Sequence, residues 1–74
     1  MKVEVRLFAF FRENRWKKQV MEYKGGSTLA DIIKEIGIEL EDVSIGLLNG
    51  IDGSLDREVK DGDVLALFPP VGGG

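Results

Sequence analysis

The sequence predicts an α+β domain in which one helix packs on a mixed sheet of four to five strands. Two observations lead to this prediction: several short runs carry apolar residues at strand spacing, and one segment carries them at helical spacing. The strand patterns occupy residues 2–7, 18–23, 43–48 and 64–68, and the helical pattern occupies residues 29–36. At 74 residues the chain is expected to form one domain, too small for a deep catalytic cleft beside its core.

The first strand pattern is an alternation of charged and apolar residues. Val3, Val5 and Leu7 fall on one face of a half-buried strand, because successive side chains point to opposite faces. The second strand pattern ends before Gly25-Gly26, which is a turn or bulge signal. We expect these two strands to pair antiparallel across a longer loop at residues 8–16.

The helical segment carries its own start and stop signals. Ser27 and Thr28 offer an N-cap, and Asp31 completes a short capping box and places a negative charge at the positive end of the helix. Gly37 stands where a left-handed residue would end the helix. The apolar stripe follows the i, i+3, i+4, i+7 spacing and consists of Leu29, Ile32, Ile33 and Ile36. We expect this stripe to face the sheet.

The second half of the chain supplies the remaining strands. Asn49-Gly50 follows the run at residues 43–48 and favours the type I′ turn of a hairpin, whose two central residues have positive φ. The last strand ends at Pro69-Pro70, since proline cannot donate to a strand ladder. The resulting order is strand, strand, helix, strand, a short strand and a last strand, which is a β-grasp arrangement.

The last strand has apolar residues at both its odd and its even positions, so both of its faces are apolar. The open face of a sheet covered by a single helix should instead be polar. Whichever parity faces the core, the other leaves an apolar patch on the surface. Single exposed valines or alanines need no explanation, but a continuous patch on a small domain often marks a contact with another protein. The sequence therefore predicts a protein-binding surface on the last strand.

The composition disfavours several kinds of chemistry. The chain has no cysteine and no histidine, so it lacks a disulfide framework, a thiolate nucleophile, the usual general base and the usual metal ligands. Its net charge of −3 disfavours nucleic acid, its first residues lack a signal-peptide pattern, and none of its apolar runs approaches a membrane span. We expect a cytoplasmic protein with no metal site and with neither nucleic acid nor a membrane as partner.

Motifs at both ends of the chain point to a family. Residues 61–74 form a Gly-Asp turn, an apolar strand, Pro-Pro-Val and three final glycines, and residues 7–13 read Leu-Phe-Ala-Phe-Phe-Arg-Glu. With the length and the element order, these motifs resemble the MoaD family, the small subunits of molybdopterin synthase within the MoaD/ThiS ubiquitin-like sulfur carriers. Gly72 stands where that family often has Ser or Ala, and Val64 takes a position that is commonly acidic.

The resemblance implies a ubiquitin-like β-grasp domain over residues 1–68 and a flexible C-terminal diglycine tail over residues 69–74. It implies that an ATP-dependent enzyme related to ubiquitin-activating enzymes adenylates the carboxylate of Gly74, which is then converted to a thiocarboxylate. The thiocarboxylate would donate sulfur for the dithiolene of molybdopterin inside the large subunit of the synthase. The carrier is then expected to contribute no catalytic side chain and to bind no cofactor, because ATP is used by the activating partner.

The tail is expected to act through its reach and its shape. Gly73 and Gly74 lack a Cβ atom, so their backbone can pass through a narrow channel beside a nucleotide. The two prolines favour an extended stem, and residues 69–74 reach roughly 20 Å at about 3.3–3.6 Å per residue. The residues expected to bind the partners are Phe8, Val64, Phe68, Pro69, Pro70, Val71, Gly72 and Gly73.

Three other functions remain open beside the molybdopterin one. A thiamine-pathway sulfur carrier shares the fold and the diglycine, although Pro-Pro-Val and Phe-Phe-Arg-Glu favour the molybdopterin branch. A protein modifier would join the same activated terminus to lysines of target proteins. A pure adaptor would use the domain alone and would not depend on Gly74.

Two charged clusters have simpler interpretations than a binding site. The basic residues near Phe10, Phe11 and Trp16 could contact single-stranded nucleic acid, but a solvated loop with a few anchoring aromatics is favoured in an acidic chain. These basic residues are Arg12, Arg15, Lys17 and Lys18. The acidic residues of the second half miss the spacing of a calcium-binding loop and are expected to form turns or to face solvent. They are Glu39, Glu41, Asp42, Asp52, Asp56, Asp61 and Asp63.

Overall fold

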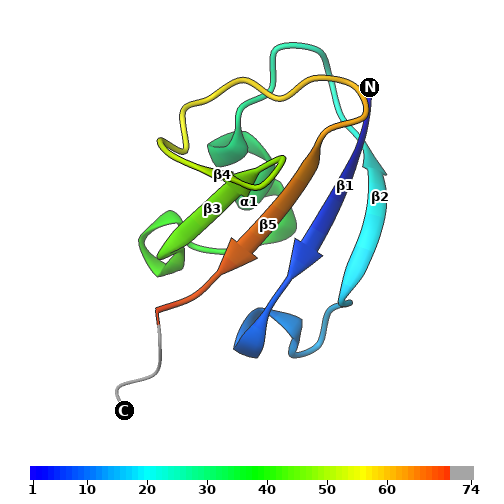
Figure 1. Cartoon of the computed structure of the whole chain (residues 1–74). Helices are drawn as coiled ribbons and strands as arrows, with labels where there is room; N and C mark the ends of the chain where they lie inside the picture. The colour runs from blue at the N-terminus through cyan, green and yellow to red at the C-terminus, as the bar shows by residue number, and fades with distance from the viewer. Residues whose placement is uncertain (71–74) are drawn as a thin grey trace.

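The computed structural model of the chain describes residues 1–70. They form a five-stranded mixed sheet with the strand order β2-β1-β5-β3-β4, and one α-helix lies across one face of it (Figure 1). The strands are β1 (Lys2–Leu7), β2 (Lys18–Glu22), β3 (Ile45–Leu48), β4 (Ile51–Asp52) and β5 (Val64–Phe68). The helices are α1 (Leu29–Ile36) and the short 3-10 helices η1 (Ala9–Arg12) and η2 (Leu40–Asp42). The predicted β-grasp arrangement is confirmed.

The last strand lies in the middle of the sheet. β5 pairs parallel with β1, where Val5 lies opposite Leu65, and antiparallel with β3, where Gly46 lies opposite Leu67. β1 also pairs antiparallel with β2, as predicted. Parallel neighbours need a long crossover, and the segment between β1 and β5 supplies one that contains the helix.

The helix begins and ends at the predicted residues. Thr28 Oγ1 accepts a hydrogen bond from the Asp31 amide at 3.2 Å, and the Thr28 amide donates to Asp31 Oδ2 at 3.0 Å. Gly37 ends the helix in the left-handed conformation, with φ of +93°. Both hydrogen bonds of the capping box are therefore present. Glycine ends the helix at a positive φ, where a Cβ would be strained.

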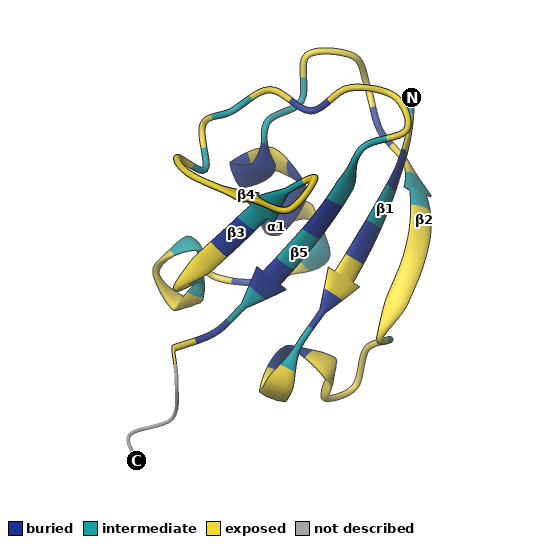
Figure 2. Ribbon diagram, viewed as in Figure 1, coloured by how far each residue is buried: buried dark blue, intermediate teal, exposed yellow. Residues whose placement is uncertain are grey.

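The core lies between α1 and the covered face of the sheet (Figure 2). Its fully buried side chains come from β1, from β5, from the helix and from the loop before β5. They are Val3, Val5, Leu7, Leu29, Ile32, Ile33, Val59, Leu65 and Leu67. Burying one such aliphatic side chain contributes about 1.5–3 kcal/mol, which makes this layer the main source of stability.

Two segments differ in detail from the sequence prediction. The third strand begins at Ile45 rather than at residue 43, because η2 occupies the chain just before it and Val43 closes that turn on Leu40 O. The predicted loop after β1 contains η1, which buries Phe11 in the core. The hairpin turn is confirmed, since φ is +52° at Asn49 and +83° at Gly50.

Among residues 1–70, no helix has the length and apolar character needed to cross a membrane.

Candidate functional site

The face of the sheet opposite α1 carries an apolar row along β5. Leu65 and Leu67 point to the core and are fully buried, whereas Val64, Ala66 and Phe68 alternate with them and are half-buried. This confirms that β5 is apolar on both faces, and it assigns the outward parity to Val64, Ala66 and Phe68.

Strand β3 widens this row. Ile45 lies opposite Phe68 and Leu47 lies opposite Ala66, so both side chains point to the same outer face. Ile45 is 40% exposed. We call the resulting surface the docking face, which consists of Phe8, Ile45, Leu47, Val64, Ala66 and Phe68. Ile45, Leu47 and Ala66 are not among the predicted docking residues, and only the register with β5 shows which parity of β3 joins them.

Phe8 closes one end of the docking face. Its ring stacks on that of Phe68, with 4.3 Å between the ring centroids and 10° between the ring planes. The Arg12 guanidinium lies over the same Phe8 ring, 5.0 Å from its centroid, and Arg12 Nε donates to Leu7 O at 2.6 Å. The Arg12 guanidinium therefore lies at the rim of the apolar surface.

Val64 lies at the other end of the docking face, at the start of β5. Its amide donates to Asn49 Oδ1 at 2.9 Å, and Asn49 Nδ2 donates to Asp63 Oδ1 at 2.9 Å. The hairpin turn is thus fastened to the start of β5. Of the three predicted partner-binding residues that lie before the tail, Phe8 and Phe68 are brought together and Val64 marks the far end of the same face.

The chain leaves the sheet beside Phe68. β5 ends at Phe68, as the two prolines predict; Pro69 is buried and Pro70 is exposed. The predicted tail residues Val71, Gly72, Gly73 and Gly74 lie outside the described residues. The tail therefore starts beside the docking face, at the end of the strand that carries half of its residues (Figure 1).

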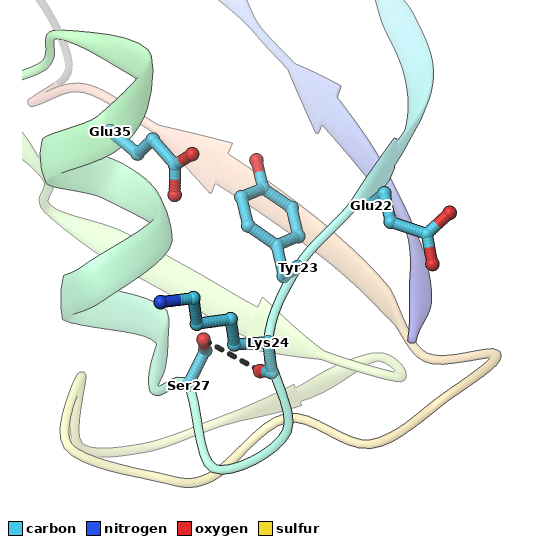
Figure 3. A pocket seen from close by; sticks show the side chains of 5 residues that line it. All are labelled: Glu22, Tyr23, Lys24, Ser27 and Glu35. Carbon is cyan, nitrogen blue, oxygen red and sulfur yellow. Dashed lines mark hydrogen bonds between the residues drawn. The ribbon is translucent and has the colours of Figure 1, made fainter.

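A second feature of the surface is an open hollow of about 570 Å³ between the end of β2 and α1. It is lined by Glu22, Tyr23, Lys24, Ser27 and Glu35 (Figure 3). Burial, and then the negative charge of Glu35, raise the pKa of Tyr23 to about 12. The phenol keeps its proton at neutral pH and cannot serve there as a base.

Two arginines of the basic loop donate hydrogen bonds to backbone carbonyls. Arg15 donates to the carbonyls of Phe11 and Gly37 at 3.3 Å and 3.2 Å, and Arg12 is held by Leu7 O. Both guanidinium groups thus fasten the loop to the domain instead of projecting as a phosphate-binding row. Within residues 1–70, no cluster of three acidic side chains is placed to hold a metal ion.

Comparisons with known proteins agree with this geometry. A family model described as the ThiS family matches residues 5–74. A search of curated protein sequences finds no match.

Among solved structures, a Pyrococcus furiosus protein assigned as subunit 1 of a molybdopterin converting factor is 34% identical over 96% of this chain and 99% of its own, with a TM-score of 0.78. SAMP1 from Haloferax volcanii is 27% identical over the full length of both chains, with a TM-score of 0.76. A chain from the complex of subunits 1 and 2 of the molybdopterin-converting factor of Helicobacter pylori 26695 is 34% identical over both full lengths, with a TM-score of 0.66.

The family model covers nearly the whole chain, and the similar structures share its one-helix mixed sheet. The chain therefore belongs to the ThiS/MoaD family of ubiquitin-like sulfur carriers.

Proposed function

We propose that the chain is the small, sulfur-carrying subunit of a molybdopterin synthase and that its working group is the carboxyl terminus of Gly74. The observation that carries the proposal is the position of β5. One strand bears the outward row of the docking face and continues directly into the tail, so a partner that covers the face also receives the tail.

The chemistry of a free carboxylate requires two partners. A carboxylate is a poor acyl donor, so its oxygen first attacks the α-phosphorus of ATP on an activating enzyme and releases pyrophosphate. A sulfur nucleophile of the donor, a sulfide or a persulfide, then displaces AMP. When it is a persulfide, a thiol attacks the donor's sulfur in the resulting acyl disulfide, forms a disulfide with it and releases the thiocarboxylate of Gly74. The carrier supplies only the reactive end, and the activating enzyme binds the ATP.

The large subunit of the synthase is the second proposed partner. In the Helicobacter pylori molybdopterin-converting factor, which includes a chain 34% identical to this one, subunit 1 is in complex with subunit 2. The docking face has the apolar centre and charged rim that are typical of a protein interface. Its centre is the half-buried row of β5, and Arg12 lies at its rim beside Phe8.

Intact-protein mass spectrometry tests the carrier reaction directly. The chain is incubated with ATP, a sulfur donor and the activating enzyme, beside a variant that lacks Gly74. We expect a mass gain equal to the replacement of one oxygen by one sulfur in the full chain and none in the variant. An unmodified full chain, with an activating enzyme that loads a known carrier in the same experiment, would contradict the proposal.

The molybdopterin assignment is tested by adding the loaded chain to a molybdopterin synthase large subunit and its sulfur-free pterin precursor. We expect the thiocarboxylate mass to revert to the carboxylate mass while the dithiolene forms. The similarity to SAMP1 and to small archaeal modifier protein 1, both from Haloferax volcanii, favours protein modification as a second candidate. That function predicts isopeptide-linked adducts on lysines, and a thiamine-type carrier would transfer its sulfur to a thiazole precursor instead.

A further inference from the structure

We propose that the outer edge of β2 pairs antiparallel with β2 of a second copy of this chain, around a two-fold axis at Val20. The two sheets would then form one continuous sheet. This inference does not rest on the sulfur-carrier function, because it uses the edge of the sheet away from the docking face.

The edge is open and presents unpaired backbone groups. β2 is an outer strand of the sheet, four of its five residues are exposed, and no other described segment covers its outer side (Figures 1 and 2). Next to β2, the Tyr23 amide donates to Met1 O and the Leu7 amide donates to Lys17 O, so residues 17 and 23 point their backbone groups toward β1. Antiparallel pairing alternates these positions along the strand. The amide and carbonyl groups of Lys18, Val20 and Glu22 therefore point outward.

These same three residues place their side chains on one face. Lys18, Val20 and Glu22 lie opposite Arg6, Glu4 and Lys2, on the side of the sheet away from α1. Val20 is 59% exposed at the centre of this edge strand, between the exposed Lys18 and Glu22. A two-fold axis at Val20 would set the two valines side by side, and each would exchange two backbone hydrogen bonds with the other.

The charge order of β2 is self-complementary under this axis. Lys18 would lie opposite Glu22 of the second copy, and Glu22 opposite Lys18, so the pairing gains two cross-strand ion pairs. Within one chain, Lys18 lies opposite the like-charged Arg6 and takes part in no ion pair among the described residues. Glu22 lies opposite Lys2, and among residues 1–70 its one ion pair is with the Met1 amino group, at 3.4 Å, so its side chain stays 72% exposed. A parallel pairing would instead set lysine against lysine and glutamate against glutamate, which favours the antiparallel dimer.

The second copy would not obstruct the candidate functional site. β1 separates β2 from β5, so the docking face and the start of the tail stay uncovered in the dimer. The strand pairing involves only five residues of each copy, far fewer than a standard interface contains, so we expect weak association.

Nuclear magnetic resonance on the isotope-labelled full chain tests the pairing. Spectra are recorded between about 20 μM and about 2 mM, the range in which a small interface dissociates. We expect the amide resonances of Lys18, Val20 and Glu22 to shift with concentration and their hydrogen exchange to slow, while the amides of the docking face do not change. Amides of β2 that are invariant over this range would overturn the proposal.

Charge reversals test the register. Lys18→Glu and Glu22→Lys should each abolish the concentration dependence, because each sets like charges opposite one another at both ends of the strand. An equimolar mixture of the two variants should associate, and the double variant K18E/E22K should recover the behaviour of the parent chain. Glu41→Lys, the same charge change on an exposed residue of η2, should leave association unchanged.

Before the association of the variants is compared, circular dichroism checks that each variant is folded. Association of the single variants that equals that of the parent chain, or failure of the mixture to associate, would reject this register. Both outcomes are independent of sulfur loading at Gly74.

Discussion

The Phe8 ring lies flat against the Phe68 ring, with 4.3 Å between their centroids. The two residues belong to opposite ends of the chain and meet because β1 and β5 are parallel neighbours. Phe8 directly follows β1 and Phe68 ends β5, so the stack joins the N-terminal part of the domain to the point where the tail begins. The stack therefore ties the docking face to the point at which β5 leaves the sheet.

Replacing Phe68 by alanine should weaken partner binding and the fold by similar amounts. We expect roughly half of the about 3–5 kcal/mol that a fully buried phenylalanine loses on truncation, because Phe68 is half-buried. Affinity for the proposed partner, the large subunit of the synthase, should fall about 10- to 100-fold, as when an aromatic interface residue is truncated. Urea denaturation and calorimetric titration measure the two effects.

Ile51→Ala is the matched control for this prediction. Ile51 is 68% exposed and lies on the edge strand β4, outside the docking face. Its truncation should leave the affinity unchanged. Equal effects of the two substitutions on binding would show that the docking face is not where the partner binds.

Arg57 should be the most important polar side chain for the stability of the β3–β4 hairpin. Its guanidinium donates to four carbonyls: Ser54 O at 2.6 Å, Ile51 O at 2.7 Å, Gly46 O at 2.7 Å and Gly53 O at 3.1 Å. Arg57→Ala should lower the free energy of unfolding by about 2–4 kcal/mol, because charge-assisted hydrogen bonds are lost and carbonyls are left unpaired.

Arg57→Lys separates charge from geometry at this position. Lysine keeps the charge, but its compact ammonium cannot span four carbonyls, so we expect it to restore only part of the loss. In Arg57→Ala, hydrogen exchange of the backbone amides should become faster in β3 and β4 and remain unchanged in β2. A change below about 0.5 kcal/mol in Arg57→Ala, the usual range for an inert surface position, would contradict this role.

The capping box should contribute about 1 kcal/mol through each partner. Thr28→Ala removes the acceptor of the Asp31 amide, and Asp31→Ala removes the acceptor of the Thr28 amide. Because the two bonds are reciprocal, the double variant should lose less than the sum of the two single losses. Ser27→Ala is the control: its hydroxyl bonds to Lys24 O and does not cap the helix, so its effect on thermal unfolding should be smaller. Equal losses of stability in Ser27→Ala and Thr28→Ala would show that Thr28 is not the N-cap.

Tyr23, the single tyrosine, should lose its phenol proton at a higher pH than an ordinary tyrosine does. Burial and then Glu35 raise the pKa of Tyr23 to about 12, so the folded state holds the phenol proton more tightly than the unfolded chain does. This contribution to stability is complete below about pH 10, the ordinary pKa of tyrosine, and is lost as the pH rises toward about 12.

Ultraviolet absorbance of the tyrosinate measures this pKa, and circular dichroism reports whether the chain is still folded. Glu35→Gln should lower the pKa of Tyr23 because it removes the neighbouring negative charge. Glu41→Gln, on an exposed residue of η2, should not change it. A midpoint near pH 10 in the folded parent chain would contradict the raised value.

Local signals in the sequence were sufficient for most of the elements. The Thr28 cap and Gly37 fix the helix boundaries, and the Asn49-Gly50 turn fixes the hairpin, because these features depend on residues that are neighbours in the chain. The tail motif is local too, and it pointed to the family that the comparisons then showed.

Other features depend on contacts between distant segments. The apolar run of β5 has two equivalent parities, and only its position between β1 and β3 decides that Leu65 faces the core and Phe68 faces outward. The clasp of Arg57 on four carbonyls has no sequence signature, because its partners are backbone atoms whose identity the side-chain pattern does not reveal.

The sequence by itself determined which segments become the strands and the α-helix, and that Pro69-Pro70 end the last strand, because these follow from local propensity and backbone restriction. The tertiary structure alone decided which strands are neighbours. That choice stacks Phe8 on Phe68 and adds Ile45 to the docking face. It also leaves the edge of β2 open, since strand order is set by how the whole sheet buries its core against one helix.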